Sequence, residues 1–109
     1  MADYDWYCDD VFSGKLKVER LYEDDLVLAF LHPRPVTPIH AVVVPKAHID
    51  SVLSQDALDP ELLMSILRAF QFVPKELGLD KTGFSVGANT AAPGVTPHMH
   101  WHMNGPGVE

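Results

Sequence analysis

Apolar and polar residues alternate along this chain in several short runs, as they do in half-buried β-strands, whose successive side chains point to opposite faces. Three prolines, at positions 33, 35 and 38, break the chain before one of these runs, and β-branched residues are frequent within it. The alternating runs, a continuous apolar run at 26–31 and the β-branched run after the prolines together predict five strands, at residues 16–22, 26–31, 39–44, 83–88 and 98–103.

A different periodicity marks one helix in the middle of the chain. Asp59, Pro60 and Glu61 fit a helix start, because Asp is a good N-cap and Pro is favoured in the first helical position. Pro74 lacks an N–H group and is predicted to kink or interrupt this helix, and Gly78 is predicted to cap it. The apolar face at helical spacing consists of Leu62, Leu63, Ile66, Leu67 and Phe70.

The resulting order of elements, β-β-β-α-β-β, is typical of an α+β fold whose neighbouring strands pair as antiparallel hairpins. We therefore expect a five-stranded antiparallel sheet with one main helix and a short aromatic-rich N-terminal arm or helix at residues 4–12. The chain has 109 residues without repeats or a linker, so residues 1–109 are expected to form a single domain.

Three histidines alternate with large apolar residues near the end of the chain: His98, His100 and His102, with Met99, Trp101 and Met103 between them. A strand would place all three imidazoles on one face, whereas a helix would scatter them around its axis. Same-face neighbours on a strand are roughly 6.6 Å apart, which suits an extended anion such as a phosphate chain better than a single metal ion. Imidazole can also act as nucleophile, acid or base near neutral pH. The row therefore predicts a site that binds an anion such as a phosphate chain.

Composition narrows the range of partners. With 47% hydrophobic and 21% charged residues, the chain resembles an ordinary globular domain. Its formal net charge is −7, and its eight Lys and Arg residues are dispersed, so no basic patch for a nucleic-acid polymer is expected. A small anionic ligand remains compatible with this charge, because imidazoles and backbone amides bind phosphate without a lysine cluster.

Cysteine usage and hydropathy indicate the compartment. Cys8 is the only cysteine, which excludes an intramolecular disulfide and a cysteine-based zinc cage. The first residues lack the basic and apolar regions of a signal peptide. No apolar run approaches the length of about 18 residues that a membrane span needs. We therefore expect a cytoplasmic protein that does not bind membranes.

Several stretches resemble the histidine triad (HIT) family, in its Hint-like branch, and the resemblance covers nearly the whole chain. The histidine row alone is moderately specific, but His40, Lys46 and His48 precede it at family-like spacing. The stretches that carry the resemblance, besides the row, are LYEDD (21–25), LAFL (28–31), PIHAVVVPKAHI (38–49) and LGL (77–79). The resemblance implies a HIT-like α+β fold.

The resemblance also implies an activity. Proteins of this branch are homodimers with a merged sheet, and they cleave the bond between the α-phosphate of a purine nucleotide and an amine, acyl or similar leaving group. They do so without a cofactor, through a nucleotidyl-histidine intermediate. By position, His100 would be the nucleophile, His102 would contact phosphate oxygens, and His98 would support them. His40 would orient the triad or, alternatively, be tied to a backbone carbonyl, and His48 is expected to be structural.

The resemblance further predicts the residues that bind the substrate. The base pocket would be lined by Tyr7, Cys8, Leu16 and Phe30, although Leu16 and Phe30 alone could equally be core residues. The other positions expected to contact the substrate are His32, Asn89, Val95 and Thr96.

The chain departs from the family pattern at the position that usually binds the ribose of the nucleotide and at the zinc-binding motif that some members have. His32 stands at the position that usually carries a ribose-binding Asp, and a neutral imidazole cannot accept from both ribose hydroxyls as a carboxylate can. Trp6 and Asp9 occupy the positions of a zinc-binding Cys-x-x-Cys, so no structural zinc is expected.

The loop before the triad departs as well. Pro93, Gly94 and Val95 stand where the family usually has Gly-Gln followed by a Ser or Thr that contacts the phosphate. Thr96 could replace this hydroxyl only if the register shifts by one residue. The loss of one oriented donor can slow an enzyme by roughly 100-fold to 1,000-fold, so the substrate range is expected to differ.

Three functions remain open at this stage. The chain could be a nucleotide phosphoramidase or hydrolase, a HIT-fold protein that binds nucleotides with little catalysis, or a metal protein using His98 and His100 with His40. The absence of Asp and Glu from residues 83–108 counts against the metal site. The short segment after Met103 also predicts an open active site in a dimer formed through the helix and its adjoining strand.

Overall fold

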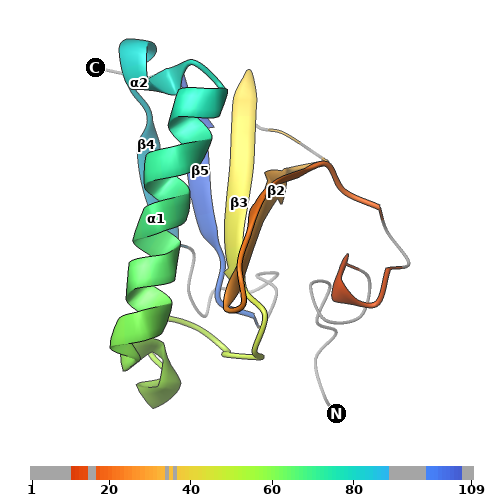
Figure 1. The fold of residues 1–109 in the computed structure, drawn as a ribbon, viewed down its shortest axis with the longest axis vertical. Helices are drawn as coiled ribbons and strands as arrows, with labels where there is room; N and C mark the ends of the chain where they lie inside the picture. Colours follow the sequence, from red (N-terminus) through yellow and green to blue (C-terminus); the bar gives the residue numbers. More distant parts are fainter. Residues whose placement is uncertain (1–10, 15–16, 34, 36, 89–97, 107–109) are drawn as a thin grey trace.

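The protein folds around a five-stranded antiparallel sheet with the strand order β1-β2-β3-β5-β4. A computed structural model describes residues 11–14, 17–33, 35, 37–88 and 98–106. One long helix lies along the sheet (Figure 1), so the predicted α+β fold is confirmed. The predicted N-terminal arm lies outside the described residues except for its last two. The strands are β1 (Arg20–Glu23), β2 (Val27–Leu31), β3 (Ile39–Pro45), β4 (Ser85–Ala88) and β5 (Trp101–Gly105).

Three strands begin later than the alternating pattern predicts. β1 begins at Arg20, and β5 begins at Trp101, after two of the three histidines of the row. β4 begins at Ser85, because the residues before it end a short helix that the pattern did not predict, α2 (Leu79–Thr82). Gly83 closes this helix with a φ of 84°, and its N–H group donates to the Leu79 carbonyl at 2.8 Å. A positive φ favours glycine here, which separates α2 from β4.

The main helix, α1 (Pro60–Glu76), begins as predicted and ends differently. The Asp59 carboxylate accepts a hydrogen bond from the Glu61 N–H group at 3.0 Å, and Pro60 is the first helical residue. Of the two effects predicted for Pro74, a kink or an interruption, the interruption is wrong, because the helix continues to Glu76. Only two helical residues follow Pro74, so its missing N–H group removes one bond from the last turn and its ring is buried. Gly78 follows with a left-handed φ of 76°, as expected of a helix end.

A 3-10 turn, η2 (Gln55–Leu58), leads into α1. Neither α1 nor any other helix in the described ranges combines the length and the apolar character needed to cross a membrane.

The two faces of the sheet carry separate apolar clusters. On one face, Leu62 and Ile66 of α1 pack against strand residues such as Val43 and Met103. Only part of the apolar face predicted for the helix packs on the sheet, because Leu63 and Leu67 are 42% and 58% exposed. The second cluster consists of Val11, Leu28, Phe30, Val42 and Val44, with Phe12 and Val18 packed against it.

The alternation of side chains along β3 and β5 shows on which face of the sheet His40 and His102 lie. Side chains of β3 alternate, so His40 lies on the same face as Val42, away from α1. Val42 pairs with His102 across the ladder between β3 and β5, and directly paired residues share a face. His40 and His102 therefore lie on the face that carries the second cluster, and this face holds the candidate site.

Candidate functional site

The histidine row is not one continuous strand. Met99 and Met103 are buried in the core on the helix side, as the alternation predicts. His98 and His100, however, precede β5, because the chain there bonds to the end of β3 and the loop beyond it instead of to a ladder. The His98 ring donates from Nε2 to the Pro45 carbonyl at 2.9 Å, and the Met99 N–H group donates to the Ile49 carbonyl at 2.6 Å. The prediction of three imidazoles in register on one strand is therefore wrong.

His100 is buried and held by its own neighbour in the row. Its Nδ1 donates to the His98 carbonyl oxygen at 2.6 Å. A carbonyl oxygen can only accept, so Nδ1 carries the proton, and in the neutral ring Nε2 then carries the lone pair. A neutral imidazole with its lone pair on Nε2 is the form that can attack an electrophile.

His102 lies beside His100 and is bonded to His40. The ring centroids of His100 and His102 are 4.9 Å apart in an edge-to-face arrangement. Nδ1 of His102 and Nε2 of His40 are 2.8 Å apart, so one ring donates to the other. Of the two alternatives for His40, a side-chain bond to a backbone carbonyl and a role in orienting the triad, this contact favours the second.

His32 extends this group by one more ring. Its backbone N–H donates to the His40 carbonyl at 2.8 Å, which continues the pairing of β2 and β3 beyond Leu31. The two imidazoles stack with centroids 4.5 Å apart and an interplanar angle of 8°, and the centroids of His32 and His102 are 6.1 Å apart. His32, His40, His102 and His100 therefore form one connected cluster of rings, which we call the histidine cluster.

Burial keeps two rings of the histidine cluster neutral near physiological pH. Loss of hydration lowers the pKa of His102 to about 4, and the neighbouring His100, His40 and His32 act in the same direction. The pKa of His40 is lowered by burial first and by His32 second. Because each imidazole disfavours a charge on the next, the rings resist simultaneous protonation.

His98 has different surroundings from the histidine cluster. It is fully buried, and its ring is hydrogen-bonded to the Pro45 carbonyl. The centroid of its ring lies 5.7 Å from that of Phe12 and 5.4 Å from that of His48. His48 is exposed, and its Nε2 lies 2.8 Å from a carboxylate oxygen of Asp50. His98 thus supports His100 through its backbone carbonyl, and His48 lies at the outer edge of this support.

A cavity of about 430 Å³ lies beside the histidine cluster. Ser85 and Asn104 line it and were not predicted as site residues. Asn104 continues the alternation of His100 and His102 by two residues, and Ser85 pairs with it across the ladder between β4 and β5. Continuing the alternation one step beyond the histidines would have found Asn104. The lining consists of His32, His40, Ser85, Val86, Gly87, Ala88, His102 and Asn104.

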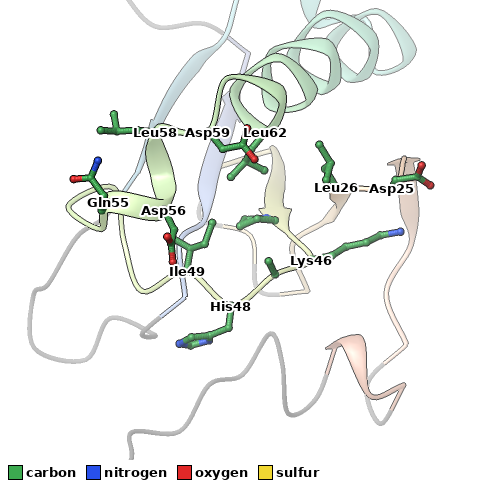
Figure 2. A pocket seen from close by; sticks show the side chains of 12 residues that line it. Asp25, Leu26, Lys46, His48, Ile49, Gln55, Asp56, Leu58, Asp59 and Leu62 are labelled. Carbon is green, nitrogen blue, oxygen red and sulfur yellow. The ribbon is translucent and has the colours of Figure 1, made fainter.

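A larger hollow, of about 590 Å³, lies between the end of β3 and the start of α1 (Figure 2). Two of its charged groups are engaged in contacts of the fold: Lys46 pairs with Glu23 at 2.7 Å, and Asp59 caps the helix. None of the rings of the histidine cluster lines it. The hollow beside the histidine cluster is therefore the better candidate site.

The structure describes part of the predicted substrate contacts. Phe30 is completely buried in the second apolar cluster, which agrees with a core residue. The remaining predicted contacts, apart from His32, lie outside the described residues: Tyr7, Cys8, Leu16, Asn89, Val95 and Thr96.

Metal ligation was one of the functions left open by the sequence. In the described part of the chain, no three His, Cys, Asp or Glu side chains are placed to share a metal ion. The three rings proposed as ligands are each hydrogen-bonded to a different group: His98 to the Pro45 carbonyl, His100 to the His98 carbonyl and His40 to the His102 ring.

Comparison with known proteins places this geometry in a family. Residues 13–106 match the HIT domain. An uncharacterized HIT-like protein of Synechococcus elongatus is 32% identical over 104 residues, covering 89% of this chain and 90% of the relative.

Solved structures agree with the sequence match. A histidine triad protein from Clostridium difficile is 33% identical with a TM-score of 0.81, covering 95% of this chain and 92% of that one. A HIT family hydrolase from Clostridium thermocellum is 27% identical with a TM-score of 0.85, covering 100% of this chain and 95% of that one. The chain belongs to the HIT domain family.

Proposed function

We propose that this protein is a HIT-type nucleotide hydrolase of the Hint-like branch, with His100 as the nucleophile. The observation that carries the proposal is the 2.6 Å bond from His100 Nδ1 to the His98 carbonyl, which leaves the lone pair on Nε2. The solved HIT family hydrolase from Clostridium thermocellum supports the reaction class.

The substrate we propose is a purine nucleotide with a phosphoramidate, acyl-phosphate or similar bond at its α-phosphate. Nε2 of His100 attacks phosphorus and forms a P–N bond, while the bond to the leaving group breaks, and that group departs with the electron pair and takes up a proton from solvent. A water molecule then attacks phosphorus and gives up a proton to solvent, the P–N bond breaks with its electron pair returning to Nε2, and the nucleoside monophosphate is released. No cofactor takes part.

His102 and His40 assist by holding a proton in a defined place. We assign the proton of their 2.8 Å contact to His40 Nε2, so that His102 accepts at Nδ1 and presents its Nε2–H group as a donor. The lowered pKa of His102, to about 4, means that this donor is a neutral imidazole near pH 7. A donor fixed before the reaction stabilises charge on the phosphoryl oxygens without reorganising.

The remaining predicted contacts complete the proposed site. Tyr7, Cys8 and Leu16 would lie near the base, and Asn89, Val95 and Thr96 near the phosphate, as the family resemblance implies. His32 belongs to the histidine cluster, so we propose that it contacts the substrate beside His40.

Hydrolysis of an adenosine phosphoramidate tests this proposal. The wild type should release AMP, and His100→Ala should lower kcat by roughly 1,000-fold or more, because no other group replaces the covalent step. His48→Ala is the matched control, since that ring is exposed and bonded to Asp50. Equal turnover by the wild type and His100→Ala would remove His100 from the mechanism.

A second candidate is nucleotide binding with little catalysis. It is favoured by Gly94 and Val95, which stand where the family usually has Gln and then a Ser or Thr, so that Val95 supplies no hydroxyl. This function predicts that calorimetry detects AMP binding by the wild type, with no phosphoramidate turnover above that of His100→Ala.

We propose that the protein is a homodimer formed through α1 and the strand beside it. The outward side of α1 carries Leu63, Met64 and Leu67, exposed by 42%, 54% and 58%, at spacings that place them together on a helix. Exposed apolar side chains grouped in this way are typical of protein interfaces. Light scattering should give a dimer for the wild type and a monomer for Leu67→Glu, with Leu53→Glu as the control outside α1. A monomeric wild type would contradict the proposal.

We also propose a cytoplasmic location. Cys8 is the single cysteine, so the fold does not depend on an intramolecular disulfide and is compatible with a reducing compartment. Fractionation of cells should recover the protein with the cytoplasmic proteins, and recovery from the membrane or the medium would contradict this.

A further inference from the structure

The cavity beside the histidine cluster is lined by groups suited to an anion. Three of its lining side chains are imidazoles, those of His32, His40 and His102. Ser85 adds a hydroxyl and Asn104 an amide, and none of the described residues that line the cavity is a carboxylate. Imidazole, hydroxyl and amide groups all donate hydrogen bonds to phosphate oxygens.

The sequence around this cavity differs in charge from the rest of the chain. The chain contains 15 Asp and Glu residues and has a net charge of −7, yet residues 26–49 and 83–108 contain none. These two stretches supply β2, β3, β4 and β5, and all the described lining residues of the cavity belong to them. An anion in the cavity would therefore meet no carboxylate from these strands, although the chain as a whole is acidic.

The rings of the cavity can gain charge when an anion binds. Each neighbouring pair is close, with centroids 4.5 Å apart for His32 and His40 and 5.0 Å apart for His40 and His102. The titratable groups that face one another are His32 after β2, His40 on β3, and His100 and His102 before and on β5, and the β4 residues in the lining do not titrate. Repulsion among these rings is relieved by a bound dianion, which raises their pKa values.

The cavity lies to one side of His100, the proposed nucleophile, and not around it. His100 does not line it, and His102 lies between His100 and the other lining rings. A phosphoryl group at His100 that contacts His102 would therefore have room on the far side of His102 for a second group. The cavity volume of about 430 Å³ is large enough for a phosphate.

We propose that this cavity is a second anion subsite, which binds a phosphate group of the substrate other than the phosphoryl group that His100 attacks. The inference rests on the proposed function for the place of the first phosphate. Within the proposed substrates, it makes a nucleotide with at least two phosphates the preferred class. The second phosphate can lie in a 5′-diphosphate chain or on the sugar of a bisphosphate.

Calorimetry with three ligands tests the subsite: AMP, the non-hydrolysable α,β-methylene analogue of ADP, and adenosine 3′,5′-bisphosphate. At about pH 6.5, where imidazole is half protonated in water, at least one ligand with two phosphates should bind about tenfold more tightly than AMP. The ligand that shows the preference identifies where the second phosphate lies. Equal affinities for all three ligands would overturn the proposal.

Substitutions of His32 assign the preference to the cavity. His32→Asn should reduce the ratio of affinities from about tenfold to about one, and His32→Asp should favour AMP, because a carboxylate repels the second phosphate. His48→Asn is the matched control outside the cavity and should keep the ratio of the wild type. Retention of that ratio by His32→Asn, with the fold checked by circular dichroism, would also overturn the proposal.

The result is separable from that of the proposed function. Loss of phosphoramidate turnover in His100→Ala tests the nucleophile, whereas the ratio of affinities tests the cavity. A preference for two phosphates that depends on His32 would support the subsite even without turnover, and turnover with equal affinities would support the hydrolase alone.

Discussion

His98 and His100 differ from His40 and His102 in what their rings are bonded to. His98 and His100 donate to the backbone carbonyls of Pro45 and His98, whereas His40 and His102 are bonded to each other. A carbonyl cannot donate, so the first pair has fixed tautomers, whereas the bond within the second pair does not by itself decide which ring donates. One pair therefore provides a fixed geometry, and the other provides groups whose protonation responds to pH and to ligands.

The largest expected effect comes from removing the fully buried ring of the first pair. His98→Ala should lower the free energy of unfolding by about 3 kcal/mol, because it leaves a cavity and removes the donor to the buried Pro45 carbonyl. Urea unfolding followed by circular dichroism measures this. His48→Ala is the matched control and should change stability by less than about 0.5 kcal/mol. Similar losses in both variants would show that the bond to Pro45 does not support the fold.

The second pair predicts a loss of stability in mild acid. His102 has a pKa of about 4 in the folded protein and about 6.5 when unfolded, so the unfolded state binds the proton more tightly. The free energy of unfolding is therefore unaffected by protonation of His102 above pH 6.5 and falls as the pH drops toward 4, by at most about 3 kcal/mol. The lowered pKa of His40 acts in the same direction.

Unfolding measured between about pH 7 and 4.5 checks this dependence. His102→Gln should flatten the curve relative to the wild type, because it removes the imidazole whose pKa is lowered to about 4 in the folded protein. His48→Gln should leave the slope unchanged. A wild-type stability that stays constant across this range would contradict the assignment of a neutral, buried His102.

The smallest expected effect separates the positioning role of His40 from a purely structural one. His40→Leu should lower kcat by about tenfold with little change in KM, because His102 loses the group that fixes its proton. His40→Gln should restore most of kcat, since its amide can donate in place of Nε2. Nitrogen NMR of His102 should report a change of tautomer in His40→Leu and none in His40→Gln. A fall in kcat without a change of tautomer would indicate that His40 only supports packing.

The sequence predicted the fold well where local rules decide the structure. Asp59 and Pro60 begin α1 as expected, since the cap and the fixed φ of proline act within a few residues. Alternation also identified His102 and Met103 as residues on opposite faces of β5. Local rules failed at Pro74, whose effect depends on how many helical residues follow it.

The site was less predictable, because its geometry depends on contacts between distant segments. No sequence rule connects His98 to Pro45, 53 residues earlier, and this bond moves His98 and His100 out of the strand. The contact between His40 and His102 likewise follows from the register of β3 and β5. The resemblance to the HIT family indicated which histidines matter, but their bonds and tautomers required the structure.

Two bonds attach the chain just before His100 to the far end of β3 and the loop beyond it, from His98 to Pro45 and from Met99 to Ile49. These two bonds, together with β5 directly after it, fix the position of His100. Under the proposed function, substitutions in residues 89–97, which include the departure from the family pattern at 93–95, change which molecules are accepted while the attacking nitrogen keeps its place. If the proposed function holds, substrate choice and reaction chemistry are separable traits, and the segment 89–97 is where directed evolution of new substrates should start.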